Sequence, residues 1–267
     1  METLIYLYGF IRANEMGNHP LPSLKGIDNE HAIYPISIGD VEAVVCDVDK
    51  KEYNEKVLEE KIEQVDWVRE KAFHHHEMMM QLHETYTIIP MKFCTIYKNT
   101  ASLMDKIDEL KEQLAVSLDY LADKEEWNLK IYCDNGILRE SISKHNLTID
   151  EKRKEIASLS PGRQYLEKKK LDQVIDQEAD KEKESFSSGI HDELKQFSVN
   201  NEVKKNWNKD VTGRTEEMCW NSVYLLPLTD VEAFLSKLKK LEEEWKASGW
   251  SLELTGPWPS YHFANLN

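Results

Sequence analysis

The apolar residues of this 267-residue chain change their spacing repeatedly, from the two-residue period of β-strands to the three-to-four-residue period of helices. Segments of both kinds are interspersed along the whole chain, which indicates an α+β protein. The chain is also about twice as long as a common domain. The sequence therefore predicts two α+β domains, covering residues 1–123 and 124–267.

The first domain is predicted to contain three strands, a helix, a fourth strand and a second helix. Its first strand is apolar on both faces, which is typical of a central position in a sheet. Gly39-Asp40 predicts a tight turn between the second and third strands. The expected strands are 3–12, 32–38, 41–48 and 88–97, the expected helices are 55–86 and 102–121, and a loop is expected over 14–26.

The second domain is predicted to follow the order β-α-β-β-α-β, which is the ferredoxin-like pattern. Its first helix is greatly extended: it begins near Gly136 and restarts at Ser160-Pro161, where Ser can cap a helix and Pro fits the first turn. We expect a long charged helix over 163–196, with a break at 187–189. The expected strands are 127–133, 199–207, 218–227 and 250–255, and the last helix follows Thr229-Asp230. Such a modified ferredoxin-like fold does not by itself indicate a function.

The charge of the chain disfavours several classes of partner. It has 34 Lys and Arg against 49 Asp and Glu, a formal net charge of −15. So acidic a surface repels phosphate backbones and anionic lipid headgroups, so we expect no nucleic-acid partner and no membrane partner. The four cysteines have no paired spacing, the N-terminus does not resemble a signal peptide, and no apolar run could cross a bilayer. These features predict an acidic cytoplasmic protein.

A histidine cluster, His74 to His76 with His83, is the most conspicuous candidate for a metal site. Helical metal sites use ligands three or four residues apart, but no HExxH or CxxC pattern is present. His75 lies on the apolar stripe of the predicted helix, so a hydrogen-bonded core histidine explains it more simply. We therefore predict no metal and no cofactor.

Signatures of catalysis are missing from the sequence. It contains no Gly-x-Ser-x-Gly elbow, no local Cys-His signature, no P-loop and no GxGxxG motif. The many carboxylates fall mostly in Glu/Lys runs, where solvation and i, i+4 pairing account for them. We therefore predict a protein that binds other proteins and is not an enzyme.

The segment from Leu252 to Phe263 carries three aromatic residues, Trp258, Tyr261 and Phe263, in a path stiffened by prolines. Each aromatic side chain can bury about 150–250 Å², which makes a freely solvated tail an unfavourable place for them. The tail is expected to fold back over a sheet or over the seam between the domains. The alternative is an aromatic surface that binds a partner.

Four segments resemble the gas vesicle protein F/L family. They are residues 88–97 (IIPMKFCTIY), 126–132 (EWNLKIY), 159–166 (LSPGRQYL) and 254–263 (LTGPWPSYHF), in the family's order over nearly the whole chain. The chain departs from the family pattern at Met91-Lys92, at Cys94 and at His262, which bears on the subtype; the L type is the expected one.

The resemblance implies two domains, the second a modified ferredoxin-like fold, and a non-enzymatic accessory protein of gas vesicle assembly. It implies binding to the small hydrophobic shell protein and to other accessory proteins, as adaptor or chaperone, in the cytoplasm and in association with gas vesicles. The motif positions expected to bind partners are Arg163, Tyr165, Leu166, Trp258, Tyr261 and Phe263. Two alternatives stay open: a minor structural component of the vesicle, or a small-molecule or metal-binding ferredoxin-like protein that uses the histidine cluster and Cys94.

Overall fold

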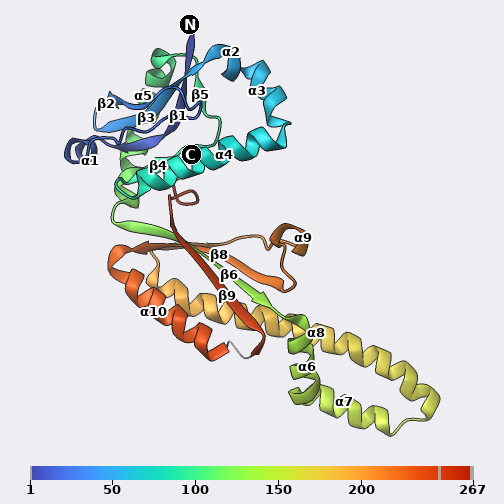
Figure 1. Ribbon diagram of the computed structural model, residues 1–267. Helices are drawn as coiled ribbons and strands as arrows, with labels where there is room; N and C mark the ends of the chain where they lie inside the picture. Colours follow the sequence, from blue (N-terminus) through green and yellow to red (C-terminus); the bar gives the residue numbers. More distant parts are fainter. Residues whose placement is uncertain (1, 246–247, 265–267) are drawn as a thin grey trace. The chain divides into compact units, whose positions relative to one another are not determined.

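The computed structural model describes residues 2–245 and 248–264 (Figure 1). Contacts divide the chain into two compact units, one formed by the residues up to Glu126 together with the tail from Pro257, the other by Trp127–Gly256. The sequence placed the boundary at 123/124 and the tail in the second domain. The contacts instead group the tail with the first unit.

The first unit contains an antiparallel sheet in the order β2-β3-β1-β4, with a short strand β5 also paired to β1. Strand β1 is buried along almost its whole length, which confirms the predicted central position. The strands are β1 (Thr3–Arg12), β2 (Ile33–Ile38), β3 (Val41–Asp49), β4 (Ile88–Pro90) and β5 (Ile96–Tyr97).

The strand predicted over 88–97 is interrupted, because the segment between its pairings with β1 at Pro90 and at Ile96 is longer than the stretch of β1 that it faces. The register of β1 with β3 shifts between Leu7 and Gly9. A Cβ at Gly9 would lie 2.6 Å from the carbonyl oxygen of Ile89, so only glycine allows β4 to approach β1 this closely. Between β4 and β5 the chain leaves the ladder, and Cys94 adopts a left-handed φ of 63° in that excursion.

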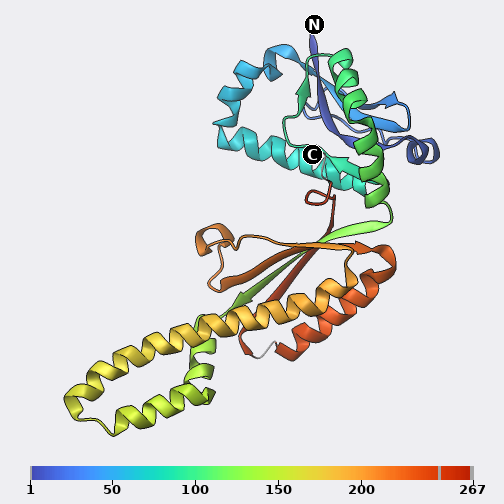
Figure 2. The same cartoon turned by 180° about the vertical axis from the view of Figure 1, so that it is seen from behind.

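Two long helices, α4 and α5, cover opposite faces of this sheet (Figures 1 and 2). The predicted helix 55–86 is in fact two helices with a break at Glu63-Gln64, and the short helix α1 occurs within the expected loop 14–26. The helix predicted over 102–121 is confirmed, and its first turn is closed by an Asn99–Ser102 capping box. The helices are α1 (Ala13–Asn18), α2 (Lys50–Tyr53), α3 (Glu55–Ile62), α4 (Val65–His83) and α5 (Thr100–Leu121).

The second unit is built on a four-stranded sheet in the order β7-β8-β6-β9. Strands β6 and β9 also carry the chain between the units, since the boundaries fall at residues 126/127 and 256/257. The strands are β6 (Lys124–Cys133), β7 (Asn200–Val203), β8 (Glu217–Pro227) and β9 (Trp250–Trp258).

Helices α8 and α10 lie side by side on one face of this second sheet (Figures 1 and 2). The break predicted at 187–189 is wrong, because α8 continues to Leu194. Ser187 is fully buried there, and the ring of Phe186 stacks on Trp250 with centroids 3.8 Å apart, so tertiary packing holds the helix through weak helix formers. The helices are α6 (Asn135–His145), α7 (Leu147–Ala157), α8 (Pro161–Leu194), η1 (Lys195–Phe197), α9 (Lys209–Thr212) and α10 (Leu228–Trp245).

His75 occupies the core of the first unit, as the sequence predicted. Its Nδ1 accepts a hydrogen bond from the Tyr6 hydroxyl at 2.8 Å, and its Nε2–H donates to the Met91 carbonyl oxygen at 3.1 Å. The imidazole also stacks on the ring of Tyr8, with centroids 5.6 Å apart. Burial disfavours the imidazolium and lowers the pKa of His75 from 6.5 to about 4. The neutral ring therefore ties α4 to β1 and to the end of β4.

This environment predicts a defined loss of stability in mild acid. Because the folded-state pKa of His75 lies below the unfolded value, its contribution is complete above pH 6.5 and is lost as the pH falls toward 4. Linkage gives a loss of about 2 kcal/mol between pH 7.5 and pH 5 from this residue. Urea unfolding at both pH values should show this loss in the wild type and a correspondingly smaller one in His75→Gln.

The matched control is His145→Gln, since His145 is exposed at the end of α6. It should keep the wild-type difference between the two pH values. A His75→Gln variant with an undiminished pH dependence would contradict the assignment.

Candidate partner-binding surfaces

The six residues predicted from motifs fall on two separate parts of the fold. Arg163, Tyr165 and Leu166 lie in the first turns of α8, in the second unit. Trp258, Tyr261 and Phe263 belong to the tail segment that groups with the first unit. The structure therefore presents two candidate surfaces, one in each unit.

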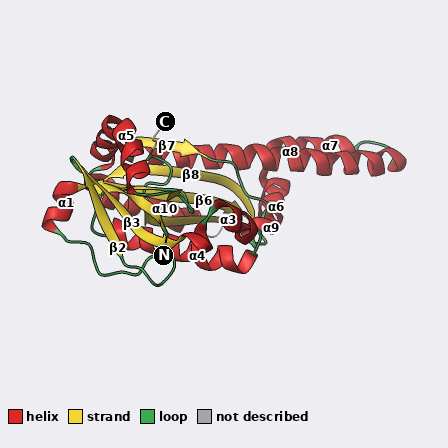
Figure 3. Ribbon diagram, turned by 90° about the horizontal axis from the view of Figure 1, so that it is seen from above, coloured by secondary structure: helices red, strands yellow, loops and turns green. Residues whose placement is uncertain are grey.

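The first surface is a helical extension formed by α6, α7 and the first half of α8. Helices α6 and α7 lead outward beyond the edge of the sheet of their own unit, and α8 returns alongside α7 (Figure 3). Asn146 both ends α6 and caps α7, where its side-chain oxygen accepts from the backbone N–H groups of Thr148 and Ile149. The buried apolar residues that hold the extension together are Leu138, Ile142, Ile149, Ile156, Leu171 and Ile175.

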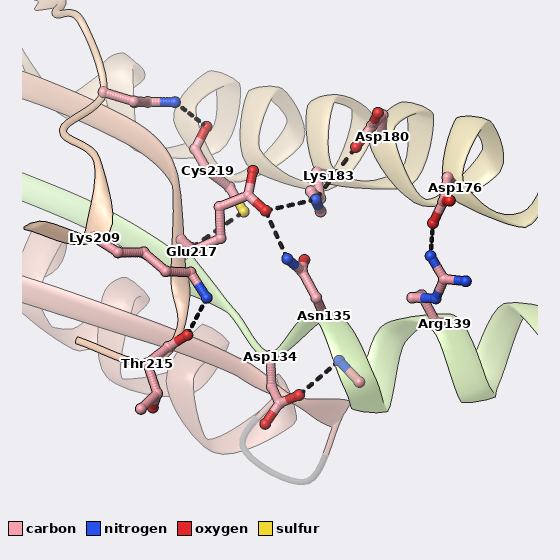
Figure 4. A network of polar contacts seen from close by, with 12 residues as sticks. Asp134, Asn135, Arg139, Asp176, Asp180, Lys183, Lys209, Thr215, Glu217 and Cys219 are labelled. Carbon is pink, nitrogen blue, oxygen red and sulfur yellow. Dashed lines mark hydrogen bonds and ion pairs between the residues drawn. The ribbon is translucent and has the colours of Figure 1, made fainter. Parts of the chain in front are cut away.

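A polar network fixes the base of this extension to the sheet (Figure 4). The Lys183 ammonium of α8 pairs with Glu217 at 3.0 Å and with Asp180 at 3.2 Å, and the Asn135 amide of α6 donates to Glu217 at 2.7 Å. Burial lowers the pKa of Lys183, but the two carboxylates outweigh it, and the net direction is upward. Arg139 pairs with Asp176 one level further out. The network orients α6 and α8 where both leave the sheet.

An open groove of about 490 Å³ lies between the three helices of the extension. Its apolar lining includes Ile156, Leu171 and Ile175, and Arg153, Lys168 and Asp172 contribute its charges. The Arg153 guanidinium spans from α7 to α6, where it donates to the backbone and side-chain oxygens of Ser143. The groove thus combines an apolar floor with charged side chains at its rim.

Large apolar side chains of the extension are exposed. Tyr165 is 64% exposed, Leu166 59% and Leu147 79%. The Lys169 ammonium lies over the Tyr165 ring, 5.3 Å from its centroid. Adjacent exposed apolar residues on a polar helix, such as Tyr165 and Leu166, are typical of an interaction surface.

The second surface is the tail, which is fastened to α4 and to the start of β6. Glu126 is fully buried and accepts hydrogen bonds from His262, from the backbone N–H at 2.9 Å and from Nδ1 at 2.6 Å. His76 hydrogen-bonds the Tyr261 hydroxyl at 3.0 Å, and its ring lies 5.4 Å from that of Trp258. The tail folds back on its unit, as the simpler of the two sequence interpretations expected.

Two of the tail aromatics differ in how far their side chains are exposed. Phe263 is only 6% exposed, so its ring is part of the packing, whereas Tyr261 is 41% exposed. Glu126 and His262 both lie in segments that resemble the family, but no spacing rule connects residues 136 positions apart. The sequence therefore did not reveal that a buried carboxylate anchors the tail.

The residues of the alternative enzyme hypothesis do not assemble into a site. Across residues 2–245 and 248–264, no three His, Cys, Asp or Glu side chains are grouped to hold a metal ion. Burial raises the pKa of the Cys94 thiol to about 11, so at neutral pH it stays protonated and is a poor nucleophile. Within the same residues, no helix has the length and apolarity of a membrane span.

Two cysteines that looked unrelated in the sequence meet in the second sheet. Cys133 ends β6 and Cys219 lies near the start of β8, and these strands are neighbours. A hydrogen bond between the two thiols lowers the pKa of Cys133 and raises that of Cys219. Both thiols are free. Their contact depends on strand pairing, which sequence spacing does not encode.

The anchor of the tail leads to a prediction about its local stability. Glu126→Ala leaves the two His262 donors without their acceptor, which should cost about 1–3 kcal/mol and release the tail. Hydrogen–deuterium exchange in residues 257–264 should become at least about tenfold faster, because 1.4 kcal/mol corresponds to a factor of ten in opening.

Glu84→Ala is the control, since Glu84 is exposed at the end of α4. Its tail should exchange at the wild-type rate. Equal protection of the tail in the Glu126→Ala variant would show that His262 is not held by this carboxylate.

Comparison with known proteins places these features in a family. The sequence model described as "Gas vesicle synthesis protein GvpL/GvpF" matches residues 4–265. Gas vesicle protein L of a Streptomyces species is 22% identical over 229 residues, which cover 85% of this chain and 81% of that protein. Gas vesicle protein F1 of Halobacterium salinarum is 20% identical over 267 residues, 100% of this chain and 95% of that protein. Relatives of both types thus match.

Two crystal structures share the fold. The gas vesicle protein GvpF of Anabaena superimposes with a TM-score of 0.73 at 19% identity, covering 98% of each chain. GvpF of Microcystis aeruginosa superimposes with a TM-score of 0.66 at 18% identity, covering 98% of this chain and 99% of that one. With a family match over almost its entire length, this chain belongs to the gas vesicle synthesis protein GvpL/GvpF family.

Proposed function

We propose that this chain is a non-enzymatic accessory protein of gas vesicle assembly, which binds the small hydrophobic shell protein and other accessory proteins as adaptor or chaperone. The observation that carries the proposal is the family match over residues 4–265. The protein would act in the cytoplasm and in association with gas vesicles.

The charge and surface of the chain suit this role physically. A shell subunit with an apolar gas-facing surface aggregates as a free monomer. A partner with a net charge of −15 keeps a complex dispersed, because like-charged complexes repel one another. The exposed Tyr165 and Leu166 supply the apolar contact that such binding requires.

We further propose that the second unit is a modified ferredoxin-like fold. Its elements follow the predicted β-α-β-β-α-β order once α6, α7 and α8 are taken as one extended first helical segment. The sheet order β7-β8-β6-β9 supports this, since the first and third strands of the pattern are neighbours at its centre. On this view the extension is an insertion that serves binding.

The proposal is tested by co-expression with the major gas vesicle shell protein, followed by affinity pull-down and measurement of soluble shell protein. Tyr165→Ser combined with Leu166→Ser should reduce the co-purified shell protein about tenfold, since a loss of about 1.4 kcal/mol from two exposed apolar anchors corresponds to that factor. The variant should fold normally, because both side chains are largely exposed.

A matched control removes two exposed apolar side chains of the first unit, Met104→Ser and Val116→Ser, which are 40% and 69% exposed. This control should retain the shell protein. Shell protein that stays insoluble and unbound with the wild-type chain would refute the chaperone role and leave family membership intact.

A further inference from the structure

The helical extension differs in charge from the rest of the molecule. Residues 150–172 hold seven Lys and Arg against five Asp and Glu, whereas the whole chain has 34 against 49. The end of the extension is therefore a basic region in a strongly acidic protein. Such a local reversal of sign attracts a partner of opposite charge over about 8 Å at physiological ionic strength.

Most of the cations in this region are not used by the fold. Arg153 contacts Asp150 at 3.5 Å and Lys170 pairs with Glu167 at 2.7 Å. Among residues 2–245 and 248–264, no carboxylate forms an ion pair with the remaining five, which are Lys152, Lys154, Arg163, Lys168 and Lys169. Three carboxylates of the region, Glu151, Glu155 and Asp172, belong to neither the Arg153–Asp150 pair nor the Lys170–Glu167 pair. The unpaired side chains thus retain a positive excess.

The groove of the extension lies within this basic region. Its apolar floor of Ile156, Leu171 and Ile175 is flanked by Arg153 on α7 and by Lys168 and Asp172 on α8, so two cations face one carboxylate and the lining is net positive. An occupant that matches it must bring apolar side chains to the floor and negative charge to both flanks. An amphipathic helix with an apolar stripe bordered by carboxylates meets both requirements.

A second copy of this chain is a poor candidate for that occupant. The apolar stripe of α5, including Leu103, Ile107 and Leu114, is already buried in its own unit. The stripe of α10, formed by Phe234, Leu238 and Leu241, is buried as well. Two copies that each carry −15 also repel one another. A nucleic acid would leave the apolar floor unoccupied.

We propose that the groove between α7 and α8, with Arg153 and Lys168 at its flanks, binds an acidic amphipathic helix of another protein. The inference deepens the proposed adaptor role and rests on it, since it names the chemistry of a partner at the same extension. Lys168, Leu171 and Ile175 share one face of α8, so a helix lying along that face meets both the apolar floor and a cation.

The test uses the full chain and fluorescently labelled peptides of about 20 residues, long enough to form a helix when bound. One peptide carries a Leu stripe bordered by Glu, a second has Lys in place of every Glu, and a third has Ser in place of every Leu. Fluorescence anisotropy should show binding of the acidic amphipathic peptide and much weaker binding of the other two. Raising the salt concentration should weaken the complex.

Charge reversal locates the site. Arg153→Glu with Lys168→Glu should lower the affinity for the acidic peptide at least about tenfold, because both flanking charges change sign. Lys56→Glu with Lys240→Glu makes the same change in net charge at exposed positions outside the extension and should leave the affinity within about twofold of wild type. Circular dichroism checks that both variants fold.

A second variant tests the groove without changing its charge. Ala157 is exposed, lines the groove and ends α7, so Ala157→Trp should obstruct the groove and weaken binding of the acidic peptide without unfolding the unit. Unchanged binding in both Ala157→Trp and the charge-reversed variant would overturn the proposal. Tighter binding of the basic peptide or of a single-stranded RNA would also overturn it, as would self-association that the charge reversal abolishes.

The outcomes separate this inference from the proposed function. If the shell protein co-purifies with the chain but the acidic peptide does not bind, the adaptor role stands and the groove proposal fails. If the peptide binds at the groove but the shell protein stays unbound, the groove proposal holds and the shell-binding role fails.

Discussion

The apolar stripe of α8 is the contact on which the second unit depends, because this one helix joins the core over the sheet to the packing of the extension. Toward its end, Ile190, His191 and Leu194 are buried in the core of the unit, where the His191 imidazole hydrogen-bonds the Tyr224 hydroxyl of β8 at 2.8 Å. Nearer its start, Leu171 and Ile175 pack against α6 and α7. The 34-residue helix is about 50 Å long, so it carries the extension well beyond the sheet.

The geometry of the candidate surface follows from that arrangement. Lys183, with Glu217 and Asn135, fixes the directions in which α8 and α6 leave the sheet. Asn146 joins α6 to α7, which runs outward, and the groove forms where α8 returns along α7 toward the sheet (Figure 1). A binding surface on packed helices keeps its shape before the partner arrives, which reduces the ordering cost of association.

In the first unit the comparable constraint is polar. His75 links β1 to α4 and to the end of β4, and it stays neutral because it is buried. The buried Glu126 anchors the tail through His262. Each group has its hydrogen-bonding partner, which is what makes a buried polar side chain tolerable in a core. Stability in this unit therefore depends on pH and on the tail.

The sequence by itself determined the mixed class, the central position of β1, the core role of His75, and the order of the main strands and long helices. It did so because apolar periodicity and Gly, Pro and Asn signals are local. Only the tertiary structure decided that α8 runs unbroken past Ser187, that Cys133 meets Cys219, and that the tail returns to Glu126. Those outcomes depend on contacts between residues far apart in the chain, whose energies override local propensity and have no signature in spacing.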